Sequence, residues 1–151
     1  MTFIRYAILL SLALMLGVAS HAGAAGGGEL MLTVVDAQTG QPLPCRMHLR
    51  NEKSRPQRAA KTVFFHDHFV FDGTVKVRLP RGTYHFVIER GPEYLDRNGY
   101  FVIENQAKDD KTVELRRACH LADEGWWSGD LHVHRPQKDI ELLMQAEDLH
   151  L

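Results

Sequence analysis

The sequence predicts a mainly β protein, an antiparallel sandwich of seven or eight strands followed by one C-terminal strand–helix unit of an incomplete α/β barrel. Short apolar or alternating segments recur over residues 29–117, separated by turn residues such as Gly, Pro, Asn and Asp. Helical periodicity is absent from that range and begins only near the C-terminus. Two sheets packed over one core fit this pattern, because each alternating strand has one apolar face.

The expected strands follow one another at turn-rich breaks. They are residues 29–36, 45–50, 61–71, 74–79, 83–90, 100–105 and 111–117. The second strand shows the alternation clearly, since Cys45, Met47 and Leu49 share one face. The polar stretch 51–61 is typical of an exposed loop. Asp72-Gly73 is a strong signal for a hairpin between the strands that flank it.

The pattern changes after Arg117. Residues 118–128 are expected to form a connector, SGDLHVH (128–134) a short strand, and the segment after Pro136 a helix with an apolar stripe. A lone strand–helix unit cannot bury both faces of its strand, so residues 129–151 are expected to be the truncated start of a larger domain. We therefore expect this tail to pack weakly, because its helix has no sheet to cover.

Residues 1–24 have the features of a secretory signal peptide: one arginine, an apolar run, and small residues that fit cleavage after Ala22 or Ala24. The run is shorter than the roughly 20 residues of a membrane-spanning helix. We expect cleavage, export to the periplasm, cell surface or medium, and no stable membrane anchor afterwards; an uncleaved anchor is the alternative. The formal net charge of −1 gives no reason to expect a nucleic-acid partner.

Two cysteines, Cys45 and Cys119, would meet an oxidising compartment after export. A disulfide between them requires that their Cα atoms come within reach, which the sequence does not show. A bridge and two independent small apolar side chains therefore both stay open.

The segment GWWSGDLHVHRP, residues 125–136, contains the candidate metal ligands His132 and His134. On a strand these two residues share a face with Asp130, so their imidazoles can converge on one cation. Neutral imidazole suits a divalent Zn, Mn or Fe ion. Asp130 is expected either to orient one of the ligands or to be structural. Two exposed, inert histidines are the alternative.

GDLHVH, preceded by two tryptophans and followed by a proline and a helix, resembles the first motif of the polymerase-and-histidinol-phosphatase (PHP) superfamily, in particular its CehA/McbA-type metallohydrolases. Several of those secreted proteins carry a β-sandwich before the metal domain. The segments DAQTGQPLPCRMHL, HFVFDG, LPRGTYHFVIERGPEY and TVELRR resemble that sandwich, and their turns are similar to those of prealbumin-like, carboxypeptidase regulatory-like modules. The resemblance covers residues 29–151.

The resemblance implies a distorted β/α barrel with two or three metal ions, in which metal-bound water hydrolyses a phosphoester or related bond. His132 and His134 would match the first two ligands, and the remaining ligands would lie beyond Leu151. Catalytic zinc normally keeps three protein ligands, so turnover by this chain alone is not expected, and metal binding by the two histidines alone stays open. The first hypothesis is thus the exported N-terminal portion of a PHP-type hydrolase of an unknown small-molecule or phosphoester substrate, with residues 29–117 as its accessory domain.

A second hypothesis is a stand-alone extracytoplasmic β-sandwich module that binds a glycan, a peptide or a cell surface, and a third is a structural spacer. Trp126 and Trp127 suit either a carbohydrate-stacking platform or a seam between domains. His66 and His68 are expected to be a solvent-facing pair at a sheet edge, with a composite site shared with the later histidine pair as the alternative.

Overall fold

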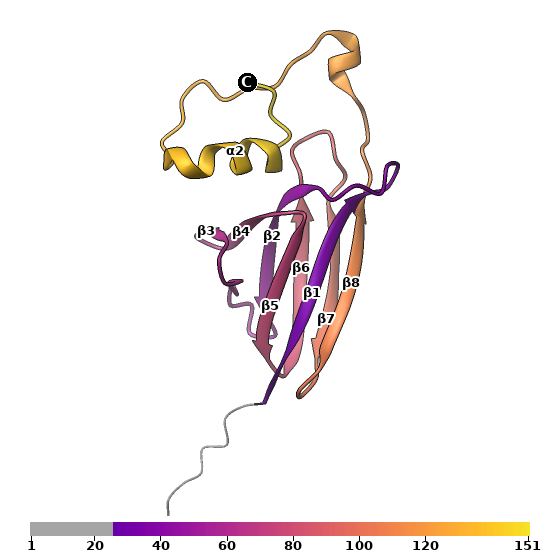
Figure 1. The fold of residues 1–151 in the computed structure, drawn as a ribbon, viewed down its shortest axis with the longest axis vertical. Helices are drawn as coiled ribbons and strands as arrows, with labels where there is room; N and C mark the ends of the chain where they lie inside the picture. The colour runs from indigo at the N-terminus through magenta and orange to yellow at the C-terminus, as the bar shows by residue number, and fades with distance from the viewer. Residues whose placement is uncertain (1–25) are drawn as a thin grey trace, which may run out of the picture.

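The computed structural model describes residues 26–151, which form two β-sheets packed face to face and an α-helix across one end of them (Figure 1). The predicted signal peptide, residues 1–24, lies outside the described residues. Over residues 26–151, neither helix combines the length and the apolar character that crossing a membrane requires.

One sheet has the strand order β5-β1-β8 and the other the order β3-β4-β2-β6-β7. In chain order the strands are β1 (Gly27–Asp36), β2 (Pro44–Asn51), β3 (Val63–Phe65), β4 (His68–Asp72), β5 (Thr74–Pro80), β6 (Gly82–Glu89), β7 (Arg97–Ile103) and β8 (Lys108–Leu115). A 3-10 helix, η1 (Leu121–Glu124), and the α-helix α2 (Gln137–Ala146) follow. The prediction of a mainly β sandwich is confirmed.

The core lies between the sheets and is built from the alternating positions that the sequence indicates. Cys45, Met47 and Leu49 of β2 are fully buried. The other strands contribute in the same way, with Leu30, Leu32, Val34, Phe69, Val75, Val77, Ile88 and Leu115 among the buried side chains. Burial of one such aliphatic or aromatic side chain stabilises the fold by about 1.5–3 kcal/mol.

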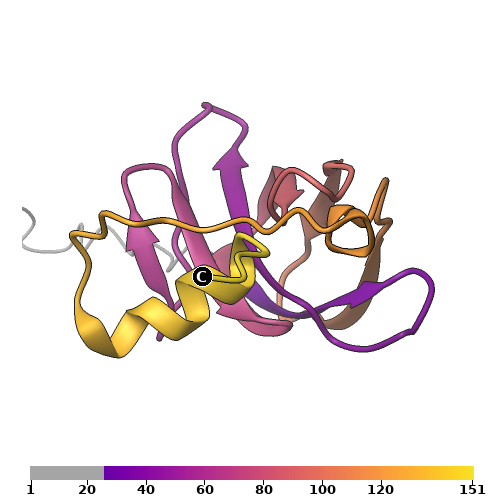
Figure 2. The same ribbon diagram turned by 90° about the horizontal axis from the view of Figure 1, so that it is seen from above.

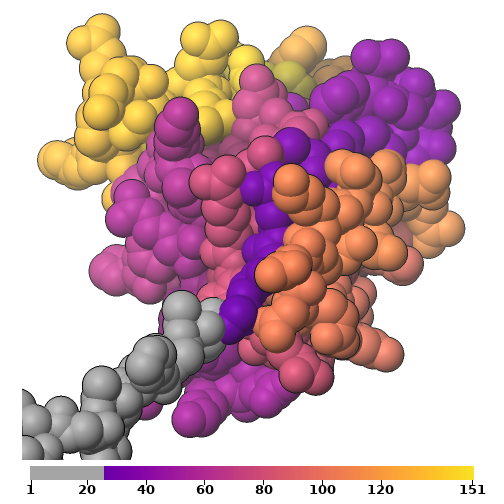
Figure 3. Space-filling model, turned by 60° about the horizontal axis from the view of Figure 1, so that its bottom comes forward, coloured from indigo at the N-terminus to yellow at the C-terminus, as the bar shows by residue number. Residues whose placement is uncertain are grey.

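Strand pairing is antiparallel except between β1 and β8, which run parallel. The space-filling view shows β8, in orange, beside the indigo β1 (Figure 3). A parallel pair needs a connection that crosses between layers. Here β8 reaches β1 after the chain has passed through the other sheet, so β1 becomes the central strand of its sheet.

Two predictions for residues 61–74 are wrong in detail. Residues 61–71 do not form one strand, because His66, at φ 46°, and Asp67 form a tight turn between β3 and β4. Gly73, at φ 64°, does not close a hairpin. It carries the chain from β4 in the five-stranded sheet to β5 in the three-stranded sheet, so its left-handed backbone serves a crossing between layers.

The short strand predicted at residues 128–134 does not form, and the side chain of Leu131 within this segment is 95% exposed. A strand needs a neighbouring ladder, and none of the described strands pairs with this segment. The segment runs across the end of the sandwich and α2 returns beside it (Figure 2). Backbone amides of His150 and Leu151 donate to the Ser128 carbonyl at 2.9 and 3.1 Å, which ties the two ends of the tail together.

The expectation that the C-terminal helix has no sheet to cover is wrong, because α2 lies on the outer face of β2 and β4. Val70 of β4 points outward yet is only 2% exposed, and Ala146 of α2 is fully buried. Asp148, just after α2, forms ion pairs with Arg90 at 2.9 Å and with Arg117 at 2.7 Å. Three ranges of the chain thus meet at the C-terminal end of α2.

Candidate functional site

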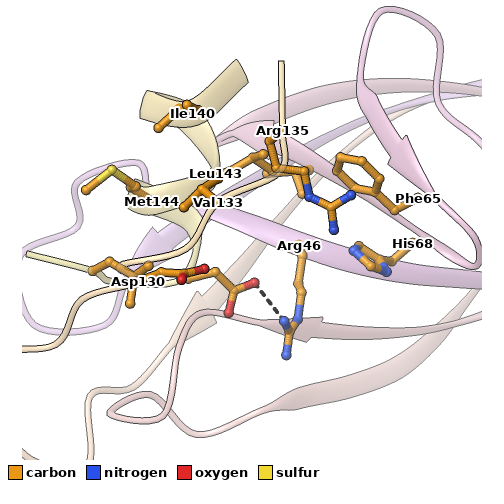
Figure 4. A pocket seen from close by; sticks show the side chains of 12 residues that line it. Arg46, Phe65, His68, Asp130, Val133, Arg135, Ile140, Leu143 and Met144 are labelled. Atoms are coloured by element: carbon orange, nitrogen blue, oxygen red, sulfur yellow. Dashed lines mark hydrogen bonds and ion pairs between the residues drawn. The ribbon is translucent and has the colours of Figure 1, made fainter. Parts of the chain in front are cut away.

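A cavity of about 250 Å³ lies between α2 and the outer face of the five-stranded sheet. Its apolar side is formed by Ile140, Leu143 and Met144 of α2 together with Val70 of β4. The polar side chains come from the sheet and from the segment before the helix: Arg46, His68, Asp130, Arg135 and Glu147. Figure 4 shows Arg135 and Phe65 side by side near His68, with the apolar side chains of α2 across the cavity.

The two arginines of this cavity differ in whether carboxylates pair with them. Arg46 donates to Glu89 and, at 2.7 Å, to Glu147. Burial acts to lower the pKa of the Arg46 guanidinium, but these two carboxylates outweigh it and raise that pKa. Arg135 stacks over the Phe65 ring at 4.0 Å and forms no ion pair with any residue of the described range. The cavity therefore presents one cation, Arg135, that no carboxylate of residues 26–151 neutralises.

His132 and His134 converge, although the strand that was expected to align them is absent. Their Nε2 atoms are 2.7 Å apart and their ring centroids 4.7 Å apart, and both side chains are exposed. Two ligands of one tetrahedral Zn²⁺ are about 3.3–3.4 Å apart. A small separation of the rings would thus let both nitrogens reach one ion, so the pair stays a predicted metal site.

Asp130 contacts the backbone of this segment and neither imidazole ring. Its carboxylate accepts a hydrogen bond from the His132 amide at 3.0 Å, which favours the structural alternative for Asp130. Trp126 and Trp127 are 69% and 64% exposed, so within residues 26–151 they fill no seam. The Trp127 and His150 rings meet in a T-shaped arrangement, with their centroids 5.0 Å apart.

The earlier histidine pair, His66 and His68, forms no three-ligand group with His132 and His134 among the described residues. His66 is exposed on its turn, whereas His68 is half-buried and faces His48 of β2. Among the described residues, the one group of three potential metal ligands is His48, Asp67 and His68. His48 was missed in the sequence because it stands alone between two arginines on an alternating strand; only strand pairing brings it opposite His68.

The two cysteines are unbridged. Cys45 is buried in the core, Cys119 is exposed in the connector, and both are free thiols. Burial raises the pKa of the Cys45 thiol far above its ordinary value, which makes it unreactive at neutral pH.

No known protein-family model matches the chain. No curated protein matches it either. Among solved structures, it is similar to the TIE protein of Bacillus anthracis, with 25% identity, a TM-score of 0.46, and coverage of 61% of this chain and 17% of that one. The pilus 2b backbone protein of group B streptococcus gives 19% identity, a TM-score of 0.47 and coverage of 63% and 43%.

The minor pilin GBS52 of Streptococcus agalactiae gives 20% identity, a TM-score of 0.43 and coverage of 63% and 45%. This chain thus spans less than half the length of each of these three proteins. Likenesses at this level assign neither a family nor a function.

Proposed function

We propose that this chain is an exported β-sandwich binding module, and that its ligand site is the cavity beneath α2. The observation that carries the proposal is the combination of an apolar wall on α2 with Arg135, a cation without a carboxylate partner in the described range. A guanidinium in such a position binds an incoming carboxylate through paired N–H donors.

A peptide end fits this cavity better than a glycan does. At about 250 Å³ it is slightly smaller than the usual range for drug-sized ligands, so it has room for one apolar side chain and its terminal carboxylate. A sugar that binds by stacking would need a free aromatic face. The aromatic ring of this cavity, Phe65, is already covered by Arg135.

Binding of dye-labelled peptides that end in a free leucine carboxylate, followed by fluorescence anisotropy, tests the proposal. We expect Arg135→Ala to weaken binding at least tenfold, because a charge-assisted hydrogen bond contributes about 1.5–3 kcal/mol. The same peptide with an amidated end should bind wild type and Arg135→Ala equally weakly. Arg97→Ala is the matched control, since Arg97, on the edge strand β7, is also exposed and forms no ion pair with the described residues. Equal affinity of wild type and Arg135→Ala would refute the site.

A second candidate function is the N-terminal part of a PHP-type metal-dependent hydrolase. It is favoured by the 2.7 Å approach of the His132 and His134 Nε2 atoms within the segment that resembles that superfamily. No His, Cys, Asp or Glu in the described range completes a three-ligand group with them. In this candidate the further ligands would be supplied by residues outside that range. Titration of the chain with Zn²⁺ or Mn²⁺ tests this candidate, and equal binding by a His132→Ala/His134→Ala double variant would refute it.

A further inference from the structure

We infer that His48, Asp67 and His68 form a binding site for a divalent transition-metal ion on the outer face of the five-stranded sheet. The site is separate from the His132 and His134 pair, and it shares only His68 with the residues that line the cavity of the peptide proposal. His48 of β2 and His68 of β4 are directly paired residues in the strand register, with ring centroids 5.0 Å apart. Asp67 occupies the β3–β4 turn immediately before His68.

The distances between the donor atoms match those of a bound ion. Nδ1 of His48 lies 3.2 Å from Asp67 Oδ2, and Nδ1 of His68 lies 3.3 Å from Asp67 Oδ1. Two tetrahedral ligands with bonds of 2.0–2.1 Å are about 3.3–3.4 Å apart, so each imidazole already has this spacing from one oxygen of Asp67. With one donor atom taken from each residue, the three atoms all lie within 4.8 Å of one another. Small side-chain rotations would bring all three to the spacing that one ion requires.

Surrounding groups support this assignment. The three side chains are 23–37% exposed, so an ion can enter from solvent and keep a water molecule as its fourth ligand. Nε2 of His48 lies 3.6 Å from the Glu89 carboxylate, which can orient the ring while Nδ1 binds the ion. Arg50 donates to Asp67 Oδ2 at 2.8 Å and leaves Oδ1 available. Two imidazoles and one carboxylate are the donor set of Zn²⁺ or Fe²⁺ sites; the hard ions Mg²⁺ and Ca²⁺ take oxygen ligands.

Zn²⁺ is the probe for the test, which uses the full chain carrying no polyhistidine tag. Isothermal titration of wild type is compared with a His48→Gln/His68→Gln double variant and with Asp67→Asn. We expect the double variant to lose one equivalent of Zn²⁺ and Asp67→Asn to bind that equivalent at least tenfold more weakly. His85→Gln is the matched control, because His85 is exposed on β6, in the same sheet, outside the group.

Two further measurements keep the outcome clear. Circular dichroism and thermal unfolding without metal should be the same for wild type and His68→Gln, a single variant that keeps the fold if the double variant does not. The His132→Ala/His134→Ala variant should retain the equivalent assigned to this site, which separates it from the hydrolase candidate. Wild-type Zn²⁺ binding by the His48→Gln/His68→Gln variant, or its loss only in the His132→Ala/His134→Ala variant, would overturn the inference.

Discussion

Replacement of Asp148 by Asn tests whether ion pairs hold α2 and the end of the chain against the five-stranded sheet. The Asp148 carboxylate contacts Arg90 at 2.9 Å and Arg117 at 2.7 and 3.1 Å, and its side chain is only 11% exposed. Its backbone is left-handed, at φ 55°, a conformation that Asn tolerates well, so the substitution removes the charge without adding backbone strain.

The expected cost is about 2 kcal/mol. Removing one partner of a buried ion pair typically costs about 3–5 kcal/mol. The loss is smaller here because Asn keeps one acceptor oxygen, Arg117 keeps Glu93 at 2.8 Å, and Arg90 keeps the Pro44 carbonyl at 2.6 Å. A cost of about 2 kcal/mol reduces the docking equilibrium roughly 30-fold.

Hydrogen exchange read by mass spectrometry measures this change segment by segment. Protection of residues 137–151 should fall by about the same factor of 30, whereas β1 and β5, which Asp148 does not contact, should keep theirs. Glu141→Gln is the control, because it also removes a carboxylate from α2 but one that is exposed and has no ion pair in the described part of the chain. Unchanged protection of α2, or an equal fall in every strand, would refute charge-based docking.

Three other outcomes are expected. Tyr94→Phe removes the hydroxyl that donates to Asp36 at 3.0 Å, and should lower the urea unfolding free energy by about 1.5 kcal/mol at pH 7. Burial acts to raise the pKa of Asp36, but its hydrogen bonds hold that pKa below the ordinary value; the contribution is therefore complete above about pH 4 and disappears as pH falls through the folded-state pKa. Native alkylation read by mass should label Cys119 and spare Cys45, and labelling of both without denaturant would contradict the burial of Cys45. Gly91 has a left-handed backbone, at φ 54°, and a Cβ added there would lie 2.2 Å from a backbone carbonyl oxygen at the end of α2. Gly91→Ala should therefore lower the hydrogen-exchange protection of α2, and unchanged protection would exclude the close contact.

Local alternation was sufficient to predict the sandwich and much of its core. Cys45, Met47 and Leu49 share a face whatever the strand pairs with, because side-chain direction in a strand depends only on sequence spacing. Pairing itself was harder to predict. Asp72-Gly73 is compatible with a hairpin and with a crossing between sheets, since both need the left-handed conformation that glycine allows.

The sites depend on contacts between distant parts of the chain, and this is why the sequence predicted them poorly. His48 and His68 become neighbours only through the β2–β4 register. The tail was expected to be loose because its helix stripe had no visible partner. Its partner is the outer face of β4, where Val70 occupies a position that alternation assigns to solvent. Arg46 and Glu147, which join that face to the helix, are 101 residues apart.

Docking of α2 and ligand binding are linked, because the cavity has one wall from the helix and one from the sheet. If α2 undocks, Ile140 and Met144 no longer face Val70, and the site ceases to exist. A ligand that binds only the docked state therefore stabilises the docking of α2. By linkage, docking strengthens ligand binding by the same free energy. Asp148 is not among the residues that line the cavity, so Asp148→Asn should weaken peptide binding only to the extent that it depopulates the docked state. Arg135→Ala should instead weaken binding with the protection of α2 unchanged, which separates loss of the site from loss of its charge.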